Sequence, residues 1–239
     1  MYIKEIKVKS YDVCKNNTIK LSSVMQYFQQ IARENLDMLG MTYNFLKEKN
    51  IVFVLTKYKI KIFKSMFADE KYIYKTSPCA VSGVSFIRDF LIEDNDGNVF
   101  AESSSTWIII DFDKRTILRP NRLPFEIAPD AKLVDFVPER IRTCVQETPS
   151  YSYSTKVKYS QLDANNHLNN CHYADIIIDG IYENGFLLPE SYEFDISYEH
   201  EAALGAELKL DFYNSDNKIY IECNNLTDGS ICFSAYFRY

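Results

Sequence analysis

The sequence predicts an α+β fold made of two similar units, each an antiparallel sheet wrapped around one long central helix. The same order of elements, a strand, a helix and then several strands, occurs twice along the 239 residues. Five of the seven prolines fall between positions 120 and 149, and proline is excluded from helix interiors and central strands. Aromatic residues, which favour strands, make up 15% of the chain.

The prolines divide the chain into three parts. We expect an N-terminal unit over residues 1–118, a proline-rich linker over residues 119–149 and a C-terminal unit over residues 150–239. The total length fits one large domain or two small ones.

The first unit begins with alternating apolar and charged residues, which predict a strand over residues 2–12. A helix is expected over residues 23–39, where apolar residues recur at helical spacing and Ser23 with Gln26 makes a capping box. The NDGN sequence at residues 95–98 is a strong hairpin-turn signal. Strand-like runs follow the helix at residues 51–63, 71–81, 85–94 and 100–112.

The second unit shows the same order, with a strand near residues 153–160 and a helix over residues 170–182. An offset of 147 aligns the two units around their helices and pairs residues 21–27 with residues 168–174. A strand, a central helix and four or five further strands is the order of a hotdog unit, so we predict a tandem (double) hotdog. The remaining strand runs are at residues 193–200, 206–213, 217–224 and 230–239.

Composition narrows the classes of function. Hydrophobic residues make up 46% of the chain, enough for a substantial core, yet no segment approaches the ~20 apolar residues of a membrane span. The N-terminal residues lack the apolar stretch of a signal peptide, so we expect a cytoplasmic protein. The net charge of −6 argues against a broad nucleic-acid-binding face.

No motif for a cofactor or metal is present. The six cysteines lie at positions 14, 79, 144, 171, 223 and 232 without CxxC spacing, and we expect them to be reduced thiols. Glycine-rich phosphate loops, zinc-binding patterns and the GxSxG sequence of α/β-hydrolases are all absent from the sequence. We therefore expect no cofactor.

The segment LDANNHLNN at residues 162–170 carries the candidate chemistry. Asp163, Asn165 and His167 are spaced by two, which on an extended segment would direct them to one side. The helix that follows offers unpaired N–H groups in its first turn, near Asn169 and Asn170, and such donors suit the oxyanion of an acyl-transfer reaction. Asp and Asn before a helix are also ordinary turn and cap residues, so a purely structural role is the alternative.

This motif, DxNxHxNN before an apolar helix that contains a tyrosine, resembles the C-terminal hotdog of plant and bacterial acyl-acyl carrier protein (acyl-ACP) thioesterases. The segments VLTKYKIKI, SGVSFIRDFLI and SSSTWIIIDFDKRTILRP resemble the N-terminal half of that family in order and spacing. The family has a glutamate in its second repeat, and alignment on Tyr198 places Glu201 there. The next position, often cysteine in the plant enzymes, is Ala202, so a thiolate at that position is excluded.

The resemblance implies hydrolysis of a fatty-acyl thioester by water in fatty-acid biosynthesis. The lack of a transit peptide and the Lys-, Ile- and Asn-rich composition indicate a bacterial cytoplasmic enzyme. It implies that Glu201 or His167 activates the water, that Asp163 orients its neighbours and that Asn165 positions the thioester carbonyl or the water. At the offset of 147, Asn16, Thr18 and Lys20 occupy the three loop positions of the first unit, so that unit would hold the acyl chain without catalysing. Cys171 is expected to be a buried residue without a catalytic role.

The implied partner is an acyl carrier protein that carries a fatty-acyl phosphopantetheine. Carrier proteins are acidic, so a local basic patch is needed on this acidic chain. Lys57, Lys59 and Lys61 are candidates, although a solvated sheet face is the favoured explanation for them. Further candidates are Arg88, Arg140 and Arg142. An acyl-CoA thioesterase, a non-catalytic acyl-binding protein and a dehydratase remain alternatives, and either a monomer or a homodimer fits.

Overall fold

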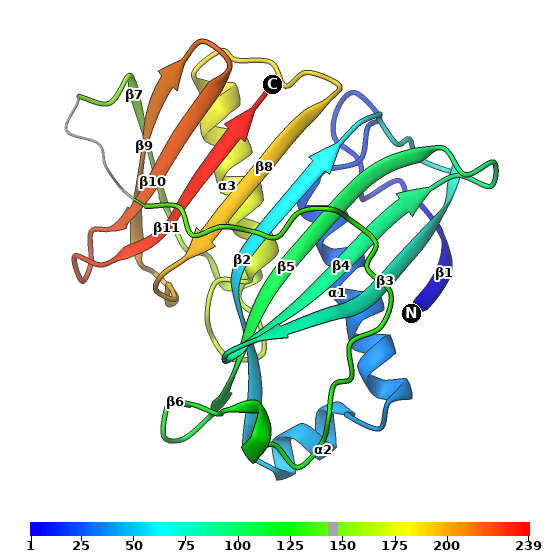
Figure 1. The fold of residues 1–239 in the computed structure, drawn as a ribbon. Coiled ribbons are helices and arrows are strands. Elements are labelled where there is room, and N and C mark those ends of the chain that lie inside the picture. The colour runs from blue at the N-terminus through cyan, green and yellow to red at the C-terminus, as the bar shows by residue number, and fades with distance from the viewer. Residues whose placement is uncertain (143–147) are drawn as a thin grey trace.

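A computed structural model of the chain describes residues 1–142 and 148–239, and Cys144 lies outside them. Within these residues, eleven strands form one antiparallel sheet, and the two long helices lie on one of its faces (Figure 1). The N-terminal half contains β1 (Tyr2–Lys7), α1 (Leu21–Met38), α2 (Tyr43–Glu48), β2 (Ile51–Ile62), β3 (Lys71–Ser82), β4 (Ser85–Glu93), β5 (Val99–Asp111), β6 (Thr116–Ile117) and a 3₁₀ turn at Pro120–Arg122. The C-terminal half contains β7 (Tyr151–Lys156), a 3₁₀ turn at Tyr159–Gln161, α3 (Asn170–Glu183), β8 (Tyr192–Tyr198), β9 (Glu207–Ser215), β10 (Lys218–Asn225) and β11 (Ile231–Arg238).

The order of strands confirms the predicted repeat. The sheet runs β1-β3-β4-β5-β2-β8-β11-β10-β9-β7, so both halves place their first strand at an outer edge and their second at the centre. The halves meet where β2 pairs antiparallel with β8, from Lys57 opposite Ser197 to Ile62 opposite Tyr192. The prediction of an α+β tandem hotdog is therefore confirmed.

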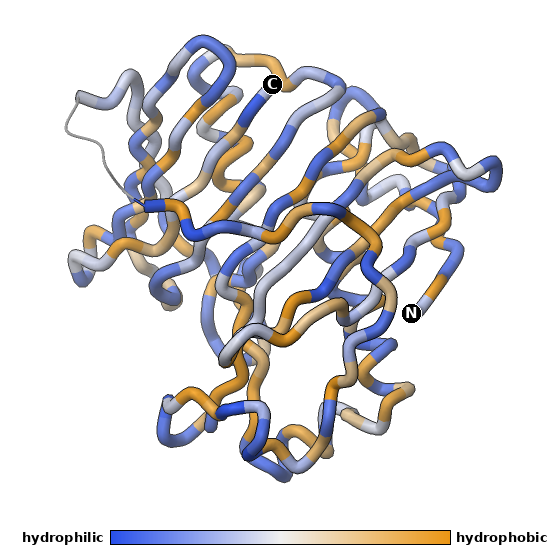
Figure 2. Tube along the Cα trace, in the orientation of Figure 1, coloured by the Kyte–Doolittle hydropathy of each residue, from blue (hydrophilic) through white to orange (hydrophobic). Residues whose placement is uncertain are grey.

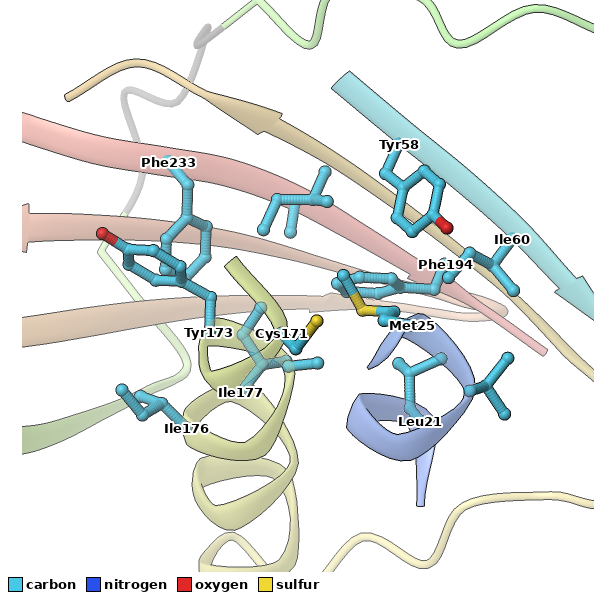
Figure 3. Packing of buried hydrophobic residues seen from close by; sticks show 14 of the residues in the cluster. Leu21, Met25, Tyr58, Ile60, Cys171, Tyr173, Ile176, Ile177, Phe194 and Phe233 are labelled. Atoms are coloured by element: carbon cyan, nitrogen blue, oxygen red, sulfur yellow. The ribbon is translucent and has the colours of Figure 1, made fainter. Parts of the chain in front are cut away.

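The core lies between the sheet and the two helices. Apolar and polar residues alternate along the strands (Figure 2), as expected where only one face of a sheet covers helices. Met25 of α1, Cys171 of α3, Tyr58 of β2 and Phe194 of β8 point into one buried cluster, which is continuous across the junction of the two halves (Figure 3).

The start of the first helix differs from the prediction. α1 begins at Leu21 rather than Ser23, and Lys20 precedes it with extended backbone and no side-chain cap. Ser23 is buried inside the helix, so the predicted capping box with Gln26 is wrong. Tertiary packing, rather than a local cap, fixes this helix end.

The predicted offset between the repeats is also wrong by two residues. Asn17 and Asn166 adopt the same left-handed backbone conformation, with φ of 62° and 63°, and the helices begin at Leu21 and Asn170. Both comparisons give an offset of 149. Sequence identity between the halves is too slight to fix the register of the two loops.

The linker crosses the face of the sheet opposite the helices, as Figure 1 shows for the green segment in front of β5, β2 and β8. The N–H of Leu133 donates to the Asp89 carboxylate at 3.1 Å, and the N–H of Ile141 donates to the Ser197 hydroxyl at 2.9 Å. The linker is thus fastened to both halves. In the parts of the chain that the structure describes, no helix has the length and apolar character needed to cross a membrane.

Candidate active site

The loop before α3 is a tight turn rather than the extended segment predicted. One oxygen of the Asp163 carboxylate accepts the N–H groups of Asn165 at 2.8 Å and His167 at 3.2 Å. Asn166 completes the turn in the left-handed conformation. The predicted extended backbone is therefore wrong, although Nδ2 of Asn165 still lies 3.4 Å from the second carboxylate oxygen of Asp163. Asp163 acts on its neighbours mainly through their backbone, and Asn165 is exposed.

The fold brings His167 and Glu201 together across 34 positions of sequence. His167 forms an isolated β-bridge with Ala203, and the N–H of Leu168 donates to the Ala202 carbonyl at 2.8 Å. This pairing brings Nδ1 of His167 to 3.2 Å from Oε2 of Glu201. The side chains are 24% and 45% exposed, so the pair is open to water on one side.

A residue not anticipated from the sequence completes the contacts of Glu201. Arg115, in the turn between β5 and β6, places Nη2 at 3.3 Å from Oε2 of Glu201. The N-terminal half therefore contributes a cation to the candidate site of the C-terminal half. Arg115 lies in the family-like segment SSSTWIIIDFDKRTILRP, but only the tertiary approach of the two halves identifies its partner.

The neighbours of Glu201 have other partners. β8 ends at Tyr198, so strand alternation does not apply to Glu199 and Glu201. Glu199 pairs with Arg140 at 3.0 Å, and Nδ1 of His200 contacts the Ile231 carbonyl. Neither Glu199 nor His200 contacts His167 in the described structure.

The N-terminus of α3 has one backbone N–H, that of Asn170, without a partner among the described residues. The N–H of Asn169 donates to the Gln161 carbonyl at 2.9 Å, so the suggestion that it binds an oxyanion is wrong. The side chain of Asn169 caps the helix by accepting the N–H of Cys171 at 2.9 Å. The N–H of Asn170 donates no hydrogen bond to any described residue, and Asn170 lines a neighbouring cavity.

Two buried residues argue against a cysteine nucleophile at these positions. Cys171 is fully buried, and burial raises the pKa of its thiol well above the ordinary value. A thiolate is therefore disfavoured at Cys171. Ala202, at the position next to Glu201, is also fully buried and carries no nucleophile.

The cavity lies almost entirely within the N-terminal half. It has a volume of about 290 Å³ and lies between α1 and strands β2 to β5. Its apolar walls include Leu36, Phe53, Phe86 and Trp107. Among the described residues that line it, Asn170 alone comes from the C-terminal half, so the cavity reaches the start of α3 next to the loop that carries His167.

The first unit lacks the acid–base set of the second. At the observed offset of 149, its loop carries Cys14, Asn16 and Thr18 in place of Asp163, Asn165 and His167. These replace the earlier assignments of Asn16, Thr18 and Lys20. Ser65 is the counterpart of Glu201 in the first unit. The residue after Ser65, Met66, accepts through its carbonyl the main-chain hydrogen bond that corresponds to the one accepted by Ala202, the residue after Glu201.

Several residues of the predicted basic patch are engaged in contacts within the described structure. Lys59 and Lys61 both pair with Glu193, at 2.9 and 3.3 Å, and both lie over the ring of Phe136 in the linker. Arg88 is buried rather than on the surface, and Arg140 is paired with Glu199. Lys59 and Lys61 thus share the Glu193 carboxylate and lie against the linker, while the use of this patch as a docking surface stays a prediction.

The fold and this geometry define a tandem hotdog protein with a histidine–glutamate pair at the start of its second central helix. Models of the acyl-ACP thioesterase N-terminal and C-terminal domains match residues 1–127 and 146–230. The chain therefore belongs to the acyl-ACP thioesterase family.

Known structures and sequences agree with this membership. An acyl-ACP thioesterase from Bacteroides thetaiotaomicron superposes with a TM-score of 0.83 at 20% identity, covering 99% of this chain and 96% of that one. The 12:0-ACP thioesterase from Umbellularia californica superposes with a TM-score of 0.79 at 15% identity, with the same coverage. The chloroplastic acyl-ACP hydrolase FATB2 of Cuphea viscosissima is 20% identical over 216 residues. These residues are 84% of this chain, and the chain spans about half of that relative's length (52%).

Proposed function

We propose that the chain is an acyl-ACP thioesterase, which hydrolyses a fatty-acyl thioester to the free acid and the carrier-protein thiol. The observation that carries this proposal is the contact of His167 with Glu201, in the loop that leads into α3 and to Asn170, which lines an apolar cavity. A base and an oxyanion donor are the groups that thioester hydrolysis requires. Membership of the acyl-ACP thioesterase family supports the carrier protein as the partner.

In the mechanism that we favour, the Glu201 carboxylate accepts the Nδ1–H of His167 and so leaves Nε2 of the ring as the base. Nε2 removes a proton from a water molecule, whose oxygen attacks the thioester carbonyl carbon. The resulting oxyanion receives the N–H of Asn170 at the positive end of α3. The C–S bond then breaks, and the imidazolium returns its proton to the departing sulfur. Glu201 acting directly on the water is the alternative role.

The remaining residues have positioning roles in this proposal. Asp163 holds the turn that presents His167, and Arg115 fixes the carboxylate of Glu201. Asn165 is exposed beside them and is available to a substrate carbonyl or water. The N-terminal half holds the acyl chain in its cavity. The proposal keeps the sequence-based expectation of a bacterial cytoplasmic enzyme of fatty-acid biosynthesis, monomeric or homodimeric.

The test is thiol release from acyl-ACPs of varied chain length, with the same acyl chains on CoA as a second panel. We expect turnover on the carrier-protein series, and a loss of at least ~100-fold in His167→Ala, the low end for a lost general base. Tyr159→Ala is a matched control, because this exposed side chain lies outside the site. Turnover on CoA alone would replace the proposal with an acyl-CoA thioesterase, and binding without turnover on either series would make the protein a non-catalytic acyl carrier.

A further inference from the structure

A cluster of positive charge lies beside the candidate catalytic pair. Residues 114–122, here called the basic turn, contain four cationic residues and no acidic one, on a chain with a net charge of −6. The four are Lys114, Arg115, Arg119 and Arg122, and all of them are exposed. The sign of the charge on this segment is therefore opposite to that of the whole protein.

The basic turn is held in place by its apolar residues. It comprises β6 and the 3₁₀ turn that follows, and it projects beyond the end of the sheet beside α2 (Figure 1). The N–H of Leu118 donates to the Ile109 carbonyl at 2.8 Å, and Leu118 and Leu123 pack against the smaller of the two core clusters. The N–H of Arg122 donates to the Arg119 carbonyl at 2.9 Å, so the two arginines lie one turn apart on an anchored segment.

The guanidinium groups of Arg119 and Arg122 have no partners in the described structure. Neither group forms an ion pair or a side-chain hydrogen bond with any described residue. Lys114 makes only a 3.6 Å contact with Asp111, and its side chain is 75% exposed. These cations therefore keep their donor groups in solvent, available to an anionic partner.

The basic turn is also the part of the N-terminal half that reaches the candidate catalytic pair. Nη2 of Arg115 lies 3.3 Å from Oε2 of Glu201. Arg119 is four residues further along the chain, so its backbone lies at most ~14 Å from that of Arg115. Ile117, between them, is 51% exposed and offers an apolar contact. A protein that delivers a thioester to this pair must rest on the surface next to it.

We propose that the basic turn is the docking surface for an acidic carrier protein, with Arg119 and Arg122 as its charged contacts and Ile117 as its apolar contact. The argument is charge complementarity: an acidic partner is repelled by the net charge of this chain and attracted by the one segment beside the site that carries only cations. This inference rests on the proposed thioesterase function and specifies how its partner is bound. Arg115 is left out of the docking contacts because Glu201 already engages it.

The test compares acyl-ACP with the same acyl chain on N-acetylcysteamine, a neutral thioester that lacks the protein. The double charge reversal Arg119→Glu with Arg122→Glu should lower kcat/KM on acyl-ACP by ~10-fold or more, mainly through KM, and leave the neutral thioester within ~2-fold of wild type. Lys9→Glu is the matched control, since it makes the same kind of charge change at an exposed lysine just after the outer-edge strand β1. We expect this control to keep wild-type kcat/KM on both substrates.

Ionic strength and a conservative variant identify charge as the cause. In wild type, kcat/KM on acyl-ACP should fall as salt is added, and the double reversal should lose that dependence. Arg119→Lys with Arg122→Lys keeps both charges and should retain most of the activity on acyl-ACP. Equal losses on acyl-ACP and the neutral thioester in the double reversal would indicate a structural effect and overturn the inference. An unchanged kcat/KM on acyl-ACP would also overturn it, and a loss in Lys57→Glu instead would assign docking to the lysines of β2.

A binding measurement separates this inference from the proposed function. If wild type hydrolyses neither thioester, the thioesterase proposal fails, and calorimetry with the phosphopantetheine-bearing carrier protein still tests the docking surface. Binding to wild type that weakens at least ~10-fold in the double reversal would support the basic turn. Equal affinities of the carrier protein for wild type and the double reversal would refute it, whether or not the chain is a thioesterase.

Discussion

Replacing Glu201 with alanine, alone and together with His167→Ala, separates the two roles open to the glutamate. Glu201 lies 3.2 Å from His167 and is 45% exposed. Loss of a general base or of its orienting partner costs ~10²- to 10⁴-fold in kcat/KM, which corresponds to ~2.7–5.4 kcal/mol of barrier. We expect each single variant to fall within this range when thiol release is measured under first-order conditions.

The double variant carries the decisive comparison. If Glu201 acts only by orienting His167, then Glu201→Ala has little further effect once the imidazole is gone, and the double variant matches His167→Ala. A further drop of ~100-fold would show that Glu201 acts on the water directly. Arg115→Ala is the control for the electrostatics of the pair: an exposed ion pair contributes ~0.2–1 kcal/mol, which predicts at most about a fivefold loss.

A Glu201→Ala variant with at least a fifth of wild-type activity would refute the reasoning, because its loss would be no larger than that of an exposed salt bridge. The circular dichroism spectrum and the unfolding midpoint of every variant must match those of wild type. This control is feasible because Glu201 and Arg115 are both exposed and neither belongs to the core.

Four further outcomes follow from particular contacts. Asp163→Asn should keep most activity, because an amide oxygen can accept the same backbone N–H groups, whereas Asp163→Ala should lose at least ~10-fold in kcat with its loop released. Asn169→Ala should lower the free energy of unfolding by ~1 kcal/mol in urea titrations, since it removes the cap on α3, and Asn169→Asp should restore it. Gly180→Ala places a Cβ 2.6 Å from Cζ of Phe212, so overpacking of ~1–3 kcal/mol should exceed the ~1 kcal/mol gain in helix propensity; a more stable variant would contradict this packing. Cys171→Ala should retain turnover within a fewfold of wild type, and a loss of ~100-fold would point instead to a thiol nucleophile.

The strands were predictable because their signals are local. The four long strands of the N-terminal half lie within one residue of the predicted limits, and the hairpin between β4 and β5 turns at Gly97 with φ of 81°. Alternating burial and turn residues determine such features within a few positions. The start of α1 lacks a local cap at Lys20, and for that reason the sequence did not predict its position.

The candidate site was predictable only as a set of residue types. The sequence singled out His167 and, through the family resemblance, Glu201, and the fold brings these two into contact. It did not predict that Asp163 would bond the backbone of its own turn, because spacing by two resembles a strand. Arg115 could not be anticipated, since its contact with Glu201 depends on the pairing of β2 with β8.

The two repeats differ in what they contribute, and neither contains a complete site. The second unit has the loop with His167, while the corresponding loop of the first has Thr18. The cavity is formed by the first unit, and Asn170 is the one residue of the second that lines it in the described structure. Arg115 of the first unit contacts Glu201 of the second.

The joined sheet allows the two units to contribute different parts of one candidate site. Pairing of β2 with β8 gives each half a partner for an otherwise open edge, and it fixes the cavity relative to the start of α3. Because the first unit has Thr18 in place of His167, its residues line the cavity without also having to position a base.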